Sequence, residues 1–488
     1  MATMLLYAIP ALLCVALALA LASTWVLQYR LTAKVAPEWR LAAILLVVGV
    51  GTLLSVALTA RDLDETKGGK LVIYDDLAGG FAASRWFSLF LVMVALIEAV
   101  RGWLQERARP VSDPARPLLL VMLAYYVGTT LIQSVASDHP EFSARSLYVP
   151  ILLAAVFYQR PRRMEPVLGA ARFVILALML GSLGALWLRP DFVVHRPDPG
   201  WIPGLDWRLF GLTSHANSLG PIALLGILIE LHAPSRWLAL RWLVRLSATA
   251  VLLLAQSKTV WAVIPMMLAF VWIPFALSSK SPRGDLAQDF RRSVLVLSAV
   301  IGVLVLLAAA AVAFDVVDLI EHRVDLLTLT GRTVIWDITL RAWQDNLLFG
   351  YGPGIWGPDR QREFRMFYVG QAHNQFIQTL GEAGLVGLAL LLAYLASLLV
   401  AAVRTFGASR GFVLMLLTLV LVRCITEAPM RADGILSWST FVHVLLLAMA
   451  CHFVRASRSG GARSPGLEEA GACRAWAPGR SGVAFDAR

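Results

Sequence analysis

The chain has 488 residues, of which 58% are hydrophobic and only 15% are charged. Soluble domains contain about 45–50% apolar and about 25% charged residues, so this composition excludes an ordinary water-soluble enzyme. The formal net charge of +11 is typical of proteins that meet nucleic acid or an anionic membrane surface. In so apolar a chain we expect membrane lipid as the partner and no nucleic acid. The 4 cysteines form no CxxC pair, which argues against a zinc or redox motif.

Apolar stretches recur along almost the whole chain and predict an all-α, polytopic membrane helix bundle of about 12–13 spans. A few of these stretches are shorter than the ~20 residues that a span needs, so the span count holds to within one or two. The predicted spans are 4–28, 41–60, 81–100, 118–137, 146–159, 173–188, 212–233, 242–257, 259–277, 294–314, 381–403, 411–429 and 436–454.

Lysine and arginine are denser in every second loop, and the positive-inside rule therefore places those loops in the cytoplasm. The long loop then lies on the opposite side of the membrane. The predicted divisions are membrane helices 1–10 within 1–314, a large extracytoplasmic loop with short helices at 315–380, the last three membrane helices at 381–454, and a disordered cytoplasmic tail at 455–488.

The long loop is larger than a simple connection requires, because loops above ~15 residues are usually functional or disordered. Thr330 is predicted to cap a helix from Gly331 to about Asn346. The glycines of 350–354 then predict a sharp turn. Arginine and aromatic side chains follow over 360–368, and contact with lipid headgroups explains them individually.

His373 follows at the expected outer boundary of the next span. An imidazole can take a proton from an attacking hydroxyl near neutral pH, although a lone histidine at a membrane boundary is more often structural. Arg332 in the same loop and Arg208 before another outer boundary favour a chemical role. Arginine can hold a diphosphate bidentately, and a lipid diphosphate leaves when sugars are transferred from lipid carriers outside the cell membrane.

Arg423 and Glu427 are four residues apart in an apolar stretch. Charges inside a membrane are costly, so we expect the two side chains to face the bundle interior and to pair. Two interpretations stay open for them, a buried structural pair and a role in shaping the cavity.

Three short patterns stand between residues 329 and 388. The first is Gly331-Arg332 with Trp336, and the second is Gly350-Tyr351-Gly352. In the third, His373-Asn374 is followed after nine residues by Gly384-x-x-Gly387. Together these patterns resemble the signature region of the O-antigen ligase superfamily, which includes O-antigen ligases, O-antigen and exopolysaccharide polymerases and some protein O-oligosaccharyltransferases. Segments 211–217 and 256–259 are similar to two further family blocks, so the resemblance spans about 205–430.

The resemblance implies a GT-C-like glycosyltransferase of the bacterial inner membrane with its large loop in the periplasm and with no cofactor or metal. It implies His373 as general base and Arg208 and Lys258 as ligands of the substrate diphosphate, and we expect Arg332 to join them. Lys258 stands where the family has arginine, and lysine lacks the planar fork that grips phosphate. We expect supporting roles for His215, Asn217, Asn374, Gly384, Gly387, Arg423 and Glu427.

The leading hypothesis is transfer of an undecaprenyl-diphosphate-linked oligosaccharide to an acceptor hydroxyl. The blocks around His215 and Arg332 are most similar to exopolysaccharide polymerases, which favours a glycan acceptor. The alternative is a ligase that transfers the glycan to lipid A-core. A more distant alternative is a non-enzymatic transporter or flippase of lipid-linked sugars, which would place its charges near the midplane and show a pseudo-repeat.

Overall fold

The computed structural model describes residues 34–59, 61–63, 78–108, 112–196, 202, 204–257, 259–261, 263–264, 267, 327–366, 369–432 and 434–459. Among these residues the chain is helical, apart from one two-stranded antiparallel ribbon. The helices of the first half are α2 (Pro37–Ala57), α3 (Ala78–Ala108), α4 (Arg116–Val135), α5 (Tyr148–Gln159), α6 (Glu165–Leu188), α7 (Pro190–Val193), α8 (Ala216–His232) and α9 (Leu238–Ala255). Those of the second half are α12 (Leu327–Gln344), α13 (Pro358–Glu363), α14 (Gln375–Arg404), α15 (Phe412–Thr426) and α16 (Trp438–Ser459).

The described part of the chain confirms an all-α polytopic membrane protein. It has 7 helices long and apolar enough to cross a membrane, namely α2, α3, α4, α6, α9, α14 and α16. The apolar helices α5, α8 and α15 are shorter. The predicted spans 4–28 and 294–314, and most of 259–277, lie outside the described residues.

Several helix ends differ from the predicted ones because polar or charged residues belong to the helices. α6 begins at Glu165, with a proline in its first turn, and therefore has 24 residues instead of a short span. α14 begins at Gln375, ahead of the apolar run that starts at 381. α16 continues to Ser459, past the predicted start of the tail, and 460–488 lies outside the described residues. Thr330 lies inside α12 and does not cap it.

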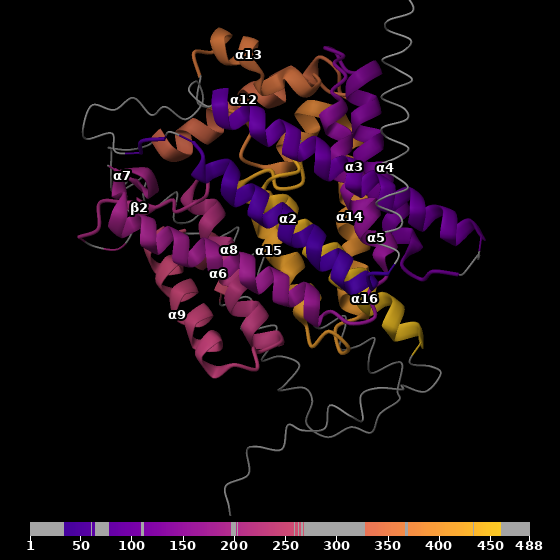
Figure 1. Ribbon diagram of the computed structural model, residues 1–488. Helices are drawn as coiled ribbons and strands as arrows, with labels where there is room; N and C mark the ends of the chain where they lie inside the picture. The colour runs from indigo at the N-terminus through magenta and orange to yellow at the C-terminus, as the bar shows by residue number, and fades with distance from the viewer. Residues whose placement is uncertain are drawn as a thin grey trace, which may run out of the picture.

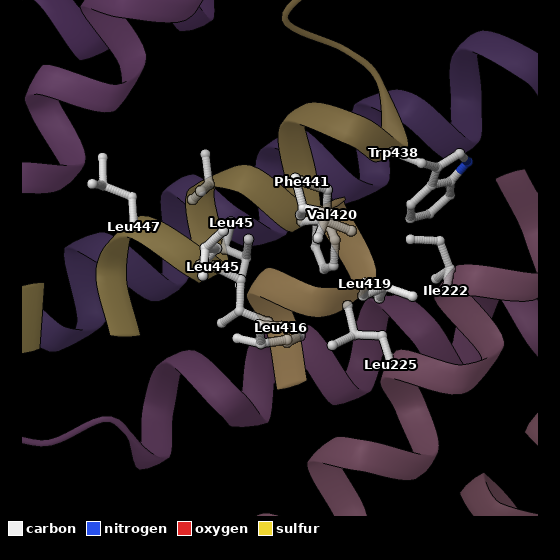
Figure 2. Packing of buried hydrophobic residues seen from close by; sticks show 14 of the residues in the cluster. Leu45, Ile222, Leu225, Leu416, Leu419, Val420, Trp438, Phe441, Leu445 and Leu447 are labelled. Carbon is white, nitrogen blue, oxygen red and sulfur yellow. The ribbon is translucent and has the colours of Figure 1, made fainter. Parts of the chain in front are cut away.

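The core of the bundle lies where α2, α8, α15 and α16 meet (Figure 2). Leu45, Leu225, Leu416 and Leu445 are fully buried there, one from each helix. In water, burial of each such leucine side chain stabilises the fold by roughly 1.5–3 kcal/mol. In lipid the dense packing itself holds the helices together. This core fixes the position of α15, whose end carries part of the site.

A second, smaller core lies beneath the loop that connects α12 to α14, at the end of the bundle shown uppermost in Figure 1. Ile335, Ile355, Trp356 and Val369 are buried in it. The 3-10 helix η3 (Pro353–Trp356) and α13 belong to this loop. We call this end of the bundle the site end, and the other the opposite end. The loop is therefore a packed cap on the helices.

Candidate active site

His373 stands one residue before the N-cap of α14, on backbone held from both sides. Asn374 caps the helix: its Oδ1 accepts hydrogen bonds from the backbone N–H groups of Phe376 (3.0 Å) and Ile377 (3.1 Å). Its Nδ2 donates to the carbonyl of Ile425 at the end of α15 (3.2 Å). His373 itself has a φ of 49°, in the left-handed region that non-glycine residues rarely adopt. Such strain persists only where the surroundings impose it, and it is frequent at functional sites.

The imidazole of His373 pairs with Glu427. Its Nδ1 lies 2.9 Å from Oε2 of the carboxylate, and the two side chains are 31% and 13% exposed. Gln371 donates from Nε2 to the same oxygen at 2.8 Å. Burial raises the pKa of the Glu427 carboxyl, but the hydrogen bond and charge of His373, with Arg423 and Arg332, outweigh it and bring the pKa to about 2.

Glu427 is therefore ionised at neutral pH and can only accept hydrogen bonds. Nδ1 of His373 therefore donates the hydrogen bond of this pair, and Nε2 is the ring nitrogen placed to accept another. This is the arrangement in which a carboxylate orients an imidazole base and stabilises its protonated form. The histidine can thus work as a general base through Nε2.

Arg208 reaches the same carboxylate through an asparagine. It lies in strand β2 (Arg208–Leu209), which pairs with β1 (Val194–His195) so that His195 stands opposite Arg208. Its guanidinium donates to the carbonyl of Ala255 (3.2 Å) and to Oδ1 of Asn217 (3.1 Å). Nδ2 of Asn217 lies 3.5 Å from Oε1 of Glu427. A polar chain therefore joins the ribbon to His373.

Arg332 and Arg423 complete the charged surroundings of Glu427. A terminal nitrogen of Arg332, from α12, lies 4.0 Å from Oε1 of Glu427. Arg423 lies in the last turn of α15, is 6% exposed, and its Nε is buried without a hydrogen bond. The expected pair of Arg423 and Glu427 within one helix does not form, because α15 ends at Thr426 and Glu427 is extended (φ −150°, ψ 176°).

His215 supports the site from the start of α8. His215 is the N-cap of α8, where its Nδ1 accepts the backbone N–H of Asn217 at 3.1 Å. Its ring packs on Phe210, with 4.6 Å between centroids. It therefore holds Asn217 in place and supports Arg208. Lys258 lies outside the described residues.

Residues 243–392 match the family model described as O-antigen ligase. This match supports membership in the O-antigen ligase superfamily. The family indicates membrane glycosyltransferase activity of the O-antigen ligase or polymerase kind. The matched segment contains Arg332 and His373 but not Arg208, Asn217 or Glu427, which the fold brings to them. The comparison with curated proteins finds no matching relative.

The superfamily's glycine pattern has a geometric reason in this chain. Gly384 interrupts α14 with φ 62° and ψ −161°, and a Cβ there would stand 2.3 Å from the backbone of Leu348. Gly350 has φ 74°, and its Cβ would meet the carbonyl of Gly381 at 2.7 Å. A Cβ added at Gly387 would stand 2.4 Å from the Cβ of Ala383. The glycines therefore let the turn at 350 rest directly on α14 and seat the cap over His373.

Sequence reasoning missed two residues of this candidate site. Gln371 bridges Glu427 and the backbone N–H of Ala428, and its amide carries no charge or motif that would reveal it. Arg61 donates to the carbonyls of Phe192, Gly211 and Thr213, and so braces the segment before α8. Arg61 directly follows the predicted span 41–60, and a count of charges does not reveal the carbonyls that its guanidinium contacts.

The other loop arginines lie elsewhere. Arg360 pairs with Glu363 (2.9 Å) and stands over the ring of Tyr351 (4.8 Å). Arg362 pairs with Asp359 at 3.0 Å. These contacts give both side chains structural partners within the cap, and contact with lipid headgroups stays a prediction.

Proposed function

We propose that the chain transfers an undecaprenyl-diphosphate-linked glycan to an acceptor hydroxyl on the periplasmic side of the bacterial inner membrane. The observation that carries the proposal is the hydrogen bond from His373 to Glu427, made within a group that also holds Arg208 and Arg332. A base of this kind next to arginines suits displacement of a diphosphate by a hydroxyl.

In the proposed reaction the acceptor oxygen attacks the anomeric carbon of the donor sugar. The bond from that carbon to the diphosphate oxygen breaks, and its electron pair leaves with the lipid diphosphate. Nε2 of His373 takes the hydroxyl proton, and Glu427 stabilises the imidazolium that forms. Each step needs only groups of this chain and the two substrates.

Arg208 and Arg332 are the proposed ligands of the departing diphosphate, because a guanidinium presents a planar fork that matches phosphate oxygens. Lys258 is a further proposed ligand on sequence grounds alone. We expect the arginines to supply the charge that a divalent metal supplies in other enzymes. Transfer should therefore persist in excess EDTA, and its loss with recovery on added Mg²⁺ would overturn this part of the proposal.

A growing surface polysaccharide on a second lipid carrier is the proposed acceptor, which makes the chain a polymerase of exopolysaccharide or O-antigen type. The support is the similarity of the blocks around His215 and Arg332 to the exopolysaccharide polymerases. The alternative acceptor is lipid A-core, as in a ligase. Elongated lipid-linked products identify a polymerase, whereas modified lipid A-core identifies a ligase.

The periplasmic placement of the cap rests on the positive-inside count. Asp359 in α13 has a side chain 94% exposed, so a cysteine introduced there is accessible. In intact cells with a permeabilised outer membrane, a membrane-impermeant maleimide should label Asp359→Cys. Labelling only after lysis of the inner membrane would reverse the orientation.

The decisive assay uses the purified full chain in nanodiscs with undecaprenyl-diphosphate-linked repeat units. Wild type should form a new glycosidic bond and release undecaprenyl diphosphate, and His373→Ala should lose about 10²–10⁴-fold in rate. Undiminished transfer by His373→Ala would remove this histidine from the reaction. Passage of glycan across vesicles without a new bond would favour the transporter alternative.

A further inference from the structure

A separate cavity lies at the site end, between α4, α14 and the residues that follow α15. Its volume is about 250 Å³, just below the roughly 300–1,000 Å³ that is typical of small-molecule sites. It is therefore suited to a small part of a ligand, such as one sugar ring. Its lining includes Tyr125, Thr129, Gln133, Ser146, Thr379 and Glu382.

The lining is rich in hydroxyl and amide groups that keep hydrogen-bonding capacity. The hydroxyl of Tyr125 donates to the carbonyl of Met430 at 3.2 Å. That of Thr129 donates to the backbone of its own helix, so its oxygen can still accept. Ser146 and the exposed Arg145 lie on the 3-10 helix η2 (Ala144–Leu147) at the rim. Such groups suit a ligand with many hydroxyls.

The inner charges of the wall neutralise each other, and the remaining charge is the exposed Arg145 at the rim. Glu382 and Arg431 form an ion pair at 2.9 Å with side chains 11% and 18% exposed. Gln378 donates to Glu382 at 2.8 Å and so fixes the carboxylate further. A wall of this kind offers little to a diphosphate, which needs excess positive charge, but it can hold a neutral polar ligand.

The cavity and the base share the same two segments. Its Thr379 and Glu382 stand in the first turns of α14, and Asn374, the N-cap residue of this helix, directly follows His373. Its Met430 and Arg431 follow Glu427 within a few residues, and Oε1 of Gln375 accepts the backbone N–H of Met430 at 2.7 Å. Arg208 and Asn217 approach Glu427 from α8 and β2, and neither lines the cavity.

We infer that this cavity is the subsite for the acceptor glycan, holding a neutral sugar ring next to the one whose hydroxyl attacks. The inference rests on the proposed function, because it places the acceptor on the α4 side of His373 and the diphosphate on the α8 side. Both substrates then reach Nε2 of His373, each from a different side.

The test compares two substitutions on the same short helix η2. Ser146→Trp fills the rim of the cavity, whereas Ala144→Trp adds the same ring at an exposed neighbour outside the lining. Arg145→Ala removes an exposed rim donor and leaves the fold intact. The probe is the repeat-unit oligosaccharide that mild acid releases from the lipid-linked glycans of the bacterium that makes the chain. Its binding to the full chain in nanodiscs is measured by saturation-transfer NMR.

Ser146→Trp should weaken oligosaccharide binding and raise the KM for the acceptor at least about 10-fold, and Arg145→Ala should do so about 3-fold. The KM for the donor and the binding by Ala144→Trp should be unchanged. If wild type transfers glycan while Ser146→Trp and Arg145→Ala bind the oligosaccharide as wild type does, the subsite is wrong and the proposed function stands. If wild type binds the oligosaccharide but transfers none, the proposed function fails by itself.

Discussion

Both ends of the bundle gather arginines around carboxylates, but they do so in different ways. At the opposite end, Asp113 accepts two nitrogens of Arg455 within 3.1 Å, and Arg160 lies 3.1 Å from it. At the site end, Arg332 stands 4.0 Å from Glu427, and Arg208 reaches it only through Asn217.

The direct ion pairs at the opposite end hold the fold, whereas the longer or relayed contacts at the site end are the ones proposed to act on a ligand. Direct, bidentate pairing uses the arginine fork on a carboxylate that stays in place. Contacts that are longer or relayed let guanidinium groups turn to a ligand when one arrives. The site end also puts an imidazole on its carboxylate, whereas Asp113 has none among its described hydrogen-bond and ion-pair partners.

Glu427→Gln should cost the most activity. The amide keeps the shape of the carboxylate but can donate to Nδ1, which removes the preference for the tautomer with a free Nε2 and the charge that stabilises the imidazolium. We expect kcat to fall roughly 10²–10⁴-fold with little change in the donor KM. Steady-state kinetics in nanodiscs measures both, and a kcat within 3-fold of wild type would contradict the proposed role.

Arg208→Ala should lower activity by about 10²–10³-fold, since it removes one set of donors to the developing diphosphate charge. Arg208→Lys should recover only part of this loss, because a point charge replaces the fork. Arg360→Ala, in the cap but paired with Glu363, is the matched control. Equal losses for Arg208→Ala and Arg360→Ala would indicate a general disturbance of the fold.

Asp113→Asn should reverse the pattern and lower stability without lowering kcat. The substitution leaves Arg455 and Arg160 without their counter-charge, at a cost of roughly 1–3 kcal/mol, because both arginines keep some exposure to solvent. Thermal unfolding in nanodiscs and the kcat of the folded fraction check the two halves. A large fall in kcat would mean that this end also takes part in the reaction.

The contribution of Glu427 to stability should depend on pH in a defined window. Its pKa is lowered in the folded chain, from 4.5 to about 2, so folding favours the ionised form. That stabilisation is complete above about pH 5 and is lost as the pH falls toward 2. The Tm difference between wild type and Glu427→Gln, a few degrees at most, should shrink as the pH falls from 5 toward 2. A difference that is unchanged between pH 5 and 3 would contradict the lowered pKa of Glu427.

The sequence predicted the class of fold because a span of about 20 apolar residues is a strong and local signal. It also indicated His373, Arg208 and Arg332 through their motifs. It could not predict that α15 ends before Glu427, since the apolar run and the charge spacing both favour a longer helix. The partner of His373 therefore comes from a place 54 residues away that only packing determines. The contacts of Gln371 and the proposed acceptor cavity are likewise products of tertiary packing.

The release of Glu427 from the end of α15 has a consequence for engineering. The cap supplies the proposed base, but the carboxylate paired with it belongs to the last part of the chain, and the Arg208 ribbon belongs to the first half. The cap is thus not a transplantable module: grafted onto another bundle, it would carry a histidine without its tautomer control. Exchange of function between relatives should require the cap, the end of α15 and the ribbon to be moved as one set.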